Sequence, residues 1–153
     1  MELLSYFLAS ILSFSALFLG FSLALAAKEE LKPGKKYFVL SQNIILALIL
    51  VFLLYFKKVS LILSIIIVIA VLLSLFYFDK IKNKYTIYPL LGIIFYLSSK
   101  NINLFVIESA LIFLYGLPTG TLLTNIKNKK QAIKNILHHI SFIIIALALF
   151  YLI

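Results

Sequence analysis

Residues 59–78 read VSLILSIIIVIAVLLSLFYF, a run of twenty residues without a single charged side chain. A helix needs about 20 predominantly apolar residues to cross the hydrocarbon core of a bilayer. Membrane-spanning β-strands instead alternate apolar and polar residues, and this run shows no such alternation. The stretch therefore predicts a membrane-spanning helix.

The composition of the whole chain agrees with this local pattern. Its 153 residues are 64% hydrophobic and 12% charged, and the mean hydropathy is +1.16. A soluble domain is about half apolar and about a quarter charged, and so small a core cannot hide such an excess. The composition excludes an ordinary soluble enzyme and a disordered chain, and the absence of cysteine excludes a disulfide-stapled domain.

Five further apolar segments accompany residues 59–78. The six predicted spans are 3–27, 37–56, 59–78, 85–99, 102–124 and 136–153. They predict an all-α, polytopic helix bundle that forms a single transmembrane domain over residues 1–153. The fourth span is short, because fifteen residues give a helix of about 22 Å against a hydrocarbon core of about 30 Å. Lys84 and Lys100 can cover part of this mismatch by extending toward the headgroups.

The lysines between the spans predict the orientation of the chain. The first, third and fifth loops hold eleven of them: Lys28, Lys32, Lys35, Lys36, Lys80, Lys82, Lys84, Lys127, Lys129, Lys130 and Lys134. The second and fourth loops hold only Lys57, Lys58 and Lys100. Cytoplasmic loops carry the excess of basic residues, so we expect a multi-pass protein of the cell membrane with both termini outside. Without the fourth span the lysines would divide eight to six, which favours six spans.

A net charge of +9 raises the question of a nucleic-acid partner. The lysines, however, lie in short clusters between apolar runs, and arginine, which binds phosphate with two parallel hydrogen bonds, is absent. We therefore expect no nucleic-acid binding. The expected partners are the lipid bilayer and, within it, other membrane proteins or a second copy of the chain. The use of lysine without arginine, together with abundant isoleucine, favours an AT-rich prokaryotic genome.

Small residues recur along the first span at intervals of three and four. They are Ala9, Ser13, Ala16, Gly20, Ala24 and Ala27. This spacing keeps them on one stripe of a helix, and small residues let helix backbones approach closely in lipid. We interpret the first span as a close-packed central helix. The alternative is that alanine and serine are simply common residues.

Glu108 is the only acidic residue inside a predicted span. An ionisable residue within a membrane is a functional candidate by default. Counted from Ile102, Glu108 lies about 9 Å from the outer boundary of its helix. Three alternatives therefore remain open, namely a hydrated position near the interface, pairing with Lys100 or Lys57, and a functional role inside the membrane.

A second group of polar or helix-weakening residues falls in the cytoplasmic third of the second, fifth and sixth spans. It consists of Gln42, Asn43, Gly116, Pro118, Thr119, Gly120, His138 and His139. Proline and glycine weaken a helix, so we expect residues 116–120 to interrupt the fifth span beside a cavity that opens to the cytoplasm. The alternative is a proline kink stabilised by Thr119 or Thr121, with the two amides tying helices together.

No catalytic residue, cofactor site or metal site is predicted. His138 and His139 are adjacent, so on a helix their side chains point about 100° apart and cannot easily share an ion. We expect a non-enzymatic membrane subunit or helper. The alternative is a permease for a small solute or ion that uses the polar layer between spans two, five and six. An intramembrane enzyme is the third interpretation, and no nucleophile–base pair or nucleotide-binding motif supports it.

Overall fold

The computed structural model describes residues 2–27, 29, 31–80, 87–123 and 137–152. Its helices are α1 (Leu3–Ala26), α2 (Leu31–Phe56), α3 (Leu61–Lys80), α4 (Ile87–Ser98), α5 (Ile102–Leu123) and α7 (Ser141–Leu152). The described residues contain no strand, so the predicted all-α class is confirmed. Three helical segments are long and apolar enough to cross a membrane: Leu3–Ala26, Pro33–Phe56 and Ile102–Leu123.

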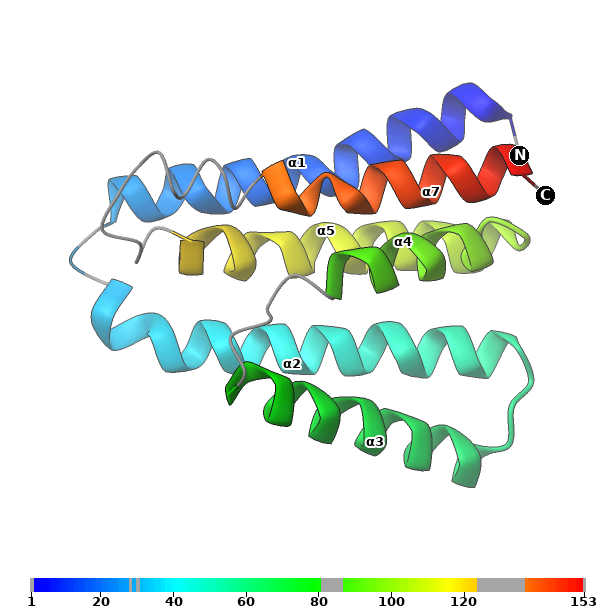
Figure 1. Cartoon of the computed structure of the whole chain (residues 1–153), viewed down its shortest axis with the longest axis horizontal. Helices are drawn as coiled ribbons and strands as arrows, with labels where there is room; N and C mark the ends of the chain where they lie inside the picture. Colours follow the sequence, from blue (N-terminus) through cyan, green and yellow to red (C-terminus); the bar gives the residue numbers. More distant parts are fainter. Residues whose placement is uncertain (1, 28, 30, 81–86, 124–136, 153) are drawn as a thin grey trace.

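Consecutive helices run in opposite directions, so both chain termini lie at the same end of the bundle (Figure 1). We call this the terminal end; it also holds Lys57, Lys58 and Lys100, between α2 and α3 and between α4 and α5. At the opposite end α1 and α5 finish and α2, α4 and α7 begin. We call that end the lysine-rich end, because Lys32, Lys35 and Lys36 lie there in the first turns of α2 and Lys80 is the last residue of α3.

The second helix begins six residues earlier than the sequence predicts, at Leu31 instead of residue 37. It passes through Pro33 and Gly34 without a break. The first turn of a helix leaves its backbone N–H groups without intrahelical partners, so a proline there loses no hydrogen bond. The charged segment before the apolar run therefore continues the same helix, with Lys35 and Lys36 exposed.

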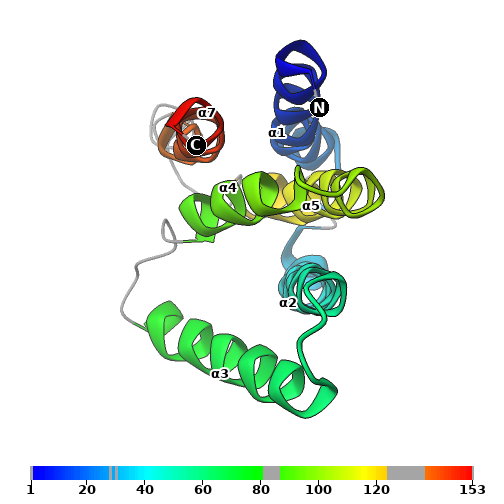
Figure 2. The ribbon, with the colours of Figure 1, turned by 90° about the vertical axis from the view of Figure 1, so that its right-hand side faces the viewer.

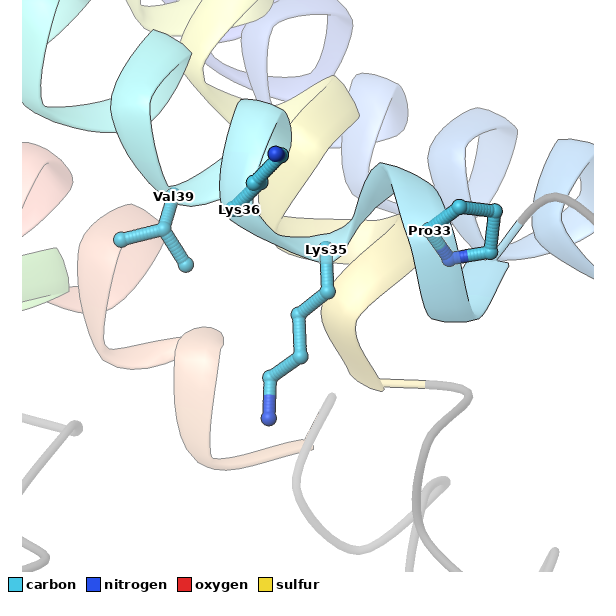
Figure 3. A pocket seen from close by; sticks show the side chains of 4 residues that line it. All are labelled: Pro33, Lys35, Lys36 and Val39. Carbon is cyan, nitrogen blue, oxygen red and sulfur yellow. The ribbon is translucent and has the colours of Figure 1, made fainter.

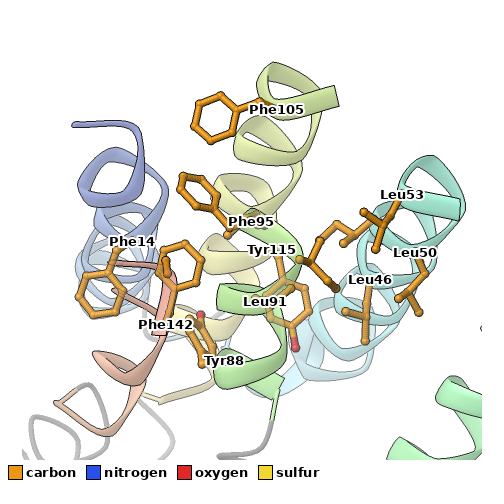
Figure 4. Close-up of a cluster of buried hydrophobic side chains, with 14 of the residues drawn as sticks. Phe14, Leu46, Leu50, Leu53, Tyr88, Leu91, Phe95, Phe105, Tyr115 and Phe142 are labelled. Atoms are coloured by element: carbon orange, nitrogen blue, oxygen red, sulfur yellow. The ribbon is translucent and has the colours of Figure 1, made fainter. Parts of the chain in front are cut away.

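Helix α5 is the centre of the bundle. It packs between α1 and α2, while α4 packs against both α5 and α7 (Figure 2). The short α4 is well covered by these neighbours, since Leu91 and Phe95 are completely buried. Figure 4 shows Phe95 and Phe142 within the cluster of buried side chains between the helices.

Helix α3 lies at the margin of the bundle and packs against α2 (Figure 2). Val68 is its only buried side chain among residues 61–74. Leu61 and Ile62 are 75% and 74% exposed. A helix that is hydrophobic all round suits the interior of a large protein or a membrane, and α3 has little protein around it.

Small residues bring the backbones of α1 and α5 into direct contact. A Cβ atom added at Gly20 would collide with the carbonyl oxygen of Leu117, and one added at Gly120 would collide with that of Leu17. A Cβ atom added at Gly116 would lie 2.9 Å from the Cβ of Ala16. At Gly20 and Gly120 there is therefore no room for any side chain, so only glycine fits.

The predicted stripe of small residues follows this contact along most of α1. Ser13, Ala16, Gly20 and Ala24 are buried, Ala9 is partly buried, and Ala27 is exposed just beyond the helix. The Ser13 hydroxyl also donates a hydrogen bond of 3.1 Å to the backbone carbonyl of Ser109 on α5. The partner of the stripe is therefore a helix of the same chain.

The expected interruption of the fifth span at residues 116–120 is wrong, because α5 continues to Leu123 with Pro118 inside it. Two hydroxyl groups support the backbone near the proline. Thr119 Oγ1 donates to the carbonyl of Tyr115 at 2.8 Å, and Thr121 Oγ1 donates to that of Pro118 at 2.7 Å. Neighbouring helices and threonine side chains allow proline within a transmembrane helix, which agrees with the alternative interpretation.

Candidate functional site

A hydrogen bond between side chains connects α2 with α5 toward the lysine-rich end. The Gln42 amide donates from Nε2 to Thr119 Oγ1 at 2.7 Å. That hydroxyl donates in turn to the backbone carbonyl of Tyr115, so it both receives and gives a hydrogen bond. Interhelical bonds of this kind contribute about 0.6 kcal/mol on average in membrane bundles. The amide at Gln42 thus ties two helices together.

Two tyrosines and a histidine extend this contact toward α4 and α7. The ring of Tyr88 on α4 lies edge-on to that of His139, with centroids 4.2 Å apart. The centroids of Tyr88 and Tyr115 are 6.2 Å apart (Figure 4), and the buried Tyr88 hydroxyl has no hydrogen-bond partner among the described residues. Tyr115 is joined to Thr119 through its backbone carbonyl. We call Gln42, Tyr88, Tyr115, Thr119 and His139 the polar cluster.

The structure brings some of the predicted polar residues together. Of the predicted layer, Gln42, Thr119 and His139 belong to the polar cluster. Asn43 and His138 are exposed. Gly116 and Gly120 contact α1, and Pro118 is buried within α5. A cavity lined by these glycines is therefore contradicted, because the α1 backbone occupies the space beside them.

Thr119 and His139 belong to the predicted polar layer, whereas Tyr88 and Tyr115 were not predicted to lie beside them. Tyrosine near a span end is typical of the headgroup level, so Tyr88 gave no signal of an interior contact. Tyr115 lies in the middle of the fifth predicted span and was not singled out. His139 is buried and His138 is exposed. Because α7 begins only at Ser141, the helical spacing of the sequence does not select one histidine over the other.

Glu108 is completely buried within the bundle. Neither carboxyl oxygen has a hydrogen-bond partner among the described residues. Both lysines considered as partners, Lys57 and Lys100, are exposed, and the Lys100 ammonium lies 5.7 Å from the centre of the Tyr96 ring. Of the three alternatives left open by the sequence, the complete burial of Glu108 contradicts the hydrated interfacial position, and its unpartnered oxygens contradict the lysine pair. Counting along the chain gave the depth of Glu108 but could not give its rotation about the helix axis.

Glu108 lies on the same stripe of α5 as two residues of the polar cluster. Tyr115 and Thr119 follow it by seven and eleven residues, which correspond to nearly whole numbers of turns at 3.6 residues per turn. The rise along the helix is about 10 Å from Glu108 to Tyr115 and about 16 Å to Thr119. One face of α5 therefore carries a carboxyl, a phenol and a hydroxyl, all in buried positions.

Two surface grooves lie away from this stripe. One is lined by Pro33, Lys35, Lys36 and Val39 at the start of α2 (Figure 3). The other lies between α1 and α5 and is lined by Ala9, Leu12, Ser13, Val106, Ser109, Ala110 and Phe113. Neither includes Glu108 or the polar cluster. Across the described ranges, no three histidine, cysteine or acidic side chains gather closely enough to hold a metal ion.

Comparisons with protein-family models, with curated proteins and with solved structures find no match to this chain. Its function is therefore inferred from the residues described above. Two features contain groups that could bind a ligand or exchange a proton. They are the isolated carboxyl of Glu108 and the polar cluster. The rest of the core is largely apolar and aromatic.

Proposed function

We propose that the chain is an integral protein of a prokaryotic cell membrane that crosses the bilayer six times. Leu3–Ala26, Pro33–Phe56 and Ile102–Leu123 support this by their length and hydropathy. The exposed apolar side chains of α3 support it as well, since they are unfavourable in water and favourable in lipid. α4 and α7 are shorter, and their termini reach headgroup level by local thinning of the bilayer and by snorkelling lysines.

The proposed orientation places the lysine-rich end in the cytoplasm and both termini outside. Because the chain has no cysteine, a single cysteine that replaces an exposed lysine reports directly on which side of the membrane that position lies. We expect a membrane-impermeant maleimide to label Lys57→Cys and Lys100→Cys in intact cells. The same reagent should label Lys35→Cys only after the membrane is permeabilised. The opposite labelling pattern would invert the proposed topology.

Within the membrane, we assign the chain the role of a non-enzymatic subunit or helper. The observation that carries this proposal is the outward surface of α3, where Ile62, Ile66 and Leu73 are all more than half exposed. Helix association in lipid is driven by van der Waals packing, and a marginal helix leaves most of its surface available for such packing. Four of the five connections between the described helices hold only three to six residues, and the fifth, between α5 and α7, holds seventeen. Most of the surface available for an extensive contact therefore lies on the helices, within the bilayer.

A photocrosslinking amino acid at Ile66 tests this role, because that side chain is 57% exposed. We expect illumination of native membranes to give one protein adduct of defined mass, and mild-detergent purification to retain the same partner in a fixed ratio. The matched control is Val68, which is buried on the same helix and should give crosslinks only within the chain. Adducts with lipid alone from Ile66 would contradict the subunit proposal.

The second candidate is a permease for a small solute or ion. The buried, unpartnered carboxyl of Glu108 favours it, since ionisable residues within membranes commonly mark ion and substrate pathways. The polar cluster supplies further donors and acceptors on the same stripe of α5. A solute would also require an open route beside these residues, whereas a proton requires only groups that exchange it.

A further inference from the structure

The position of Glu108 sets a strict limit on what it can bind. Both carboxyl oxygens are buried and lack hydrogen-bond donors in the part of the chain that the structure describes. An isolated buried charge is very costly unless it is paired or neutralised. Neither surface groove reaches the residue. The smallest ligand that neutralises a carboxylate without requiring a pocket is a proton.

The other titratable groups of the interior are few. From α1, Tyr6 donates a 2.9 Å hydrogen bond to the carbonyl of Ala146. From α4, Tyr88 and Tyr96 are buried, and on α5 Tyr115 follows Glu108 on the same stripe. His139 lies just before α7, whereas the buried positions of α2 in residues 46–53 are leucine and isoleucine. No second carboxyl or lysine is buried among the described residues.

We propose that Glu108 is a proton-binding site and that protons pass between it and the polar cluster along the inner stripe of α5. This inference goes beyond the helper role and names the ion for the second candidate function. It rests on the proposed membrane insertion and does not depend on a partner protein. Tyr115 and Thr119 continue the stripe toward His139 at the lysine-rich end.

Each transfer conserves atoms and charge. A proton from water at the terminal end forms an O–H bond with one Glu108 oxygen, about 9 Å along the helix from Ile102. It leaves when that bond breaks. Because neither surface groove reaches Glu108, water must enter the bundle transiently and carry the proton across the rise of about 10 Å to the Tyr115 hydroxyl. Each hydroxyl passes on one proton for each that it receives. His139 accepts the proton on a ring nitrogen and returns it to water.

Proton flux into liposomes tests the proposal. The purified full chain is reconstituted around a pH-sensitive dye, and valinomycin with a potassium gradient imposes a membrane potential. We expect the wild-type chain to acidify or alkalise the lumen according to the sign of the potential. Glu108→Gln should lose this flux, because an amide has nearly the shape of the carboxyl but cannot exchange a proton. Glu2→Gln, at an exposed carboxyl, is the matched control and should keep it.

Infrared spectroscopy provides a readout that a purely structural role would not change. A protonated Glu108 gives a carboxylic C=O band that shifts on hydrogen–deuterium exchange and is absent from Glu108→Gln. His139→Phe keeps an aromatic ring against Tyr88 and removes the exchanging nitrogen. It should therefore reduce the flux and leave the band in place. Absence of the band from the wild-type protein at every pH would overturn the proton-binding site.

The remaining outcomes separate the two proposals. Flux that persists in Glu108→Gln overturns the proton pathway. Absence of flux from wild-type protein that floats with the vesicles also overturns it, and leaves the helper role in place. A chain that does not float with the vesicles contradicts membrane insertion itself.

Discussion

Replacing Gly120 with alanine is expected to destabilise the bundle by about 1–3 kcal/mol, which is the usual cost of inserting a methylene group into a packed core. The added Cβ would collide with the backbone carbonyl of Leu17 and would lie 2.7 Å from the backbone nitrogen of Phe21. Backbone atoms cannot rotate away, so α1 and α5 must separate. Gly20→Ala should have a similar effect, because its Cβ meets the backbone of Leu117 from the other side of the same contact.

Gly34→Ala is the matched control for both variants. A Cβ at Gly34 would lie 3.0 Å from the ring of Phe38, which is a side chain that can move. Alanine is also the better helix former by about 1 kcal/mol. Thermal unfolding in detergent, followed by far-ultraviolet circular dichroism, should show lower midpoints for Gly20→Ala and Gly120→Ala only. Equal midpoints for all three variants would refute a backbone contact between α1 and α5.

Phe95→Ala should be the most damaging truncation in the core, with a loss of about 3 kcal/mol. This is the lower limit of the range for buried phenylalanine in soluble proteins, because lipid removes much of the transfer term and leaves the packing term. The Phe95 ring lies 5.0 Å from that of Tyr6 on α1, 4.9 Å from Phe105 on α5 and 5.4 Å from Phe142 on α7. Truncating the Phe95 side chain therefore loosens the contacts of α4 with α1, α5 and α7.

Phe7→Ala supplies the control for this truncation, since Phe7 on α1 is 39% exposed. Its loss should change stability by less than about 1 kcal/mol, as is usual for substitutions away from the core. Unfolding of both variants by titration with sodium dodecyl sulfate, at constant total detergent, gives the comparison. A Phe95→Ala midpoint equal to that of Phe7→Ala would show that α4 does not depend on this aromatic cluster.

The sequence predicted the helices well because each apolar run is a local property. Residues 59–78 satisfy the length and hydropathy of a span without reference to any neighbour, and α3 occupies nearly the same interval. The boundaries were less certain where charge and helix propensity disagree. At Lys35 and Lys36 the charge suggested a loop, but the first turns of a helix accept both charge and proline.

The candidate site was harder to predict, because rotation about a helix axis is set by packing partners that the sequence does not identify. Glu108 was found by type and depth, and its complete burial depends on how α5 lies against its neighbours. Gly116 and Gly120 were interpreted as helix breakers beside a cavity. They instead accommodate the α1 backbone, and a glycine gives the same local signal in both cases.

Hydropathy and lysine spacing alone determined that this chain is helical, and they led to the proposed threading through the membrane, since both depend on the solvent that each segment meets. Only the tertiary structure decided that Gln42 bonds Thr119 while its neighbour Asn43 faces outward. Adjacent residues on a helix point about 100° apart. Only the position of α5 against α2 selects which of the two amides faces the interior.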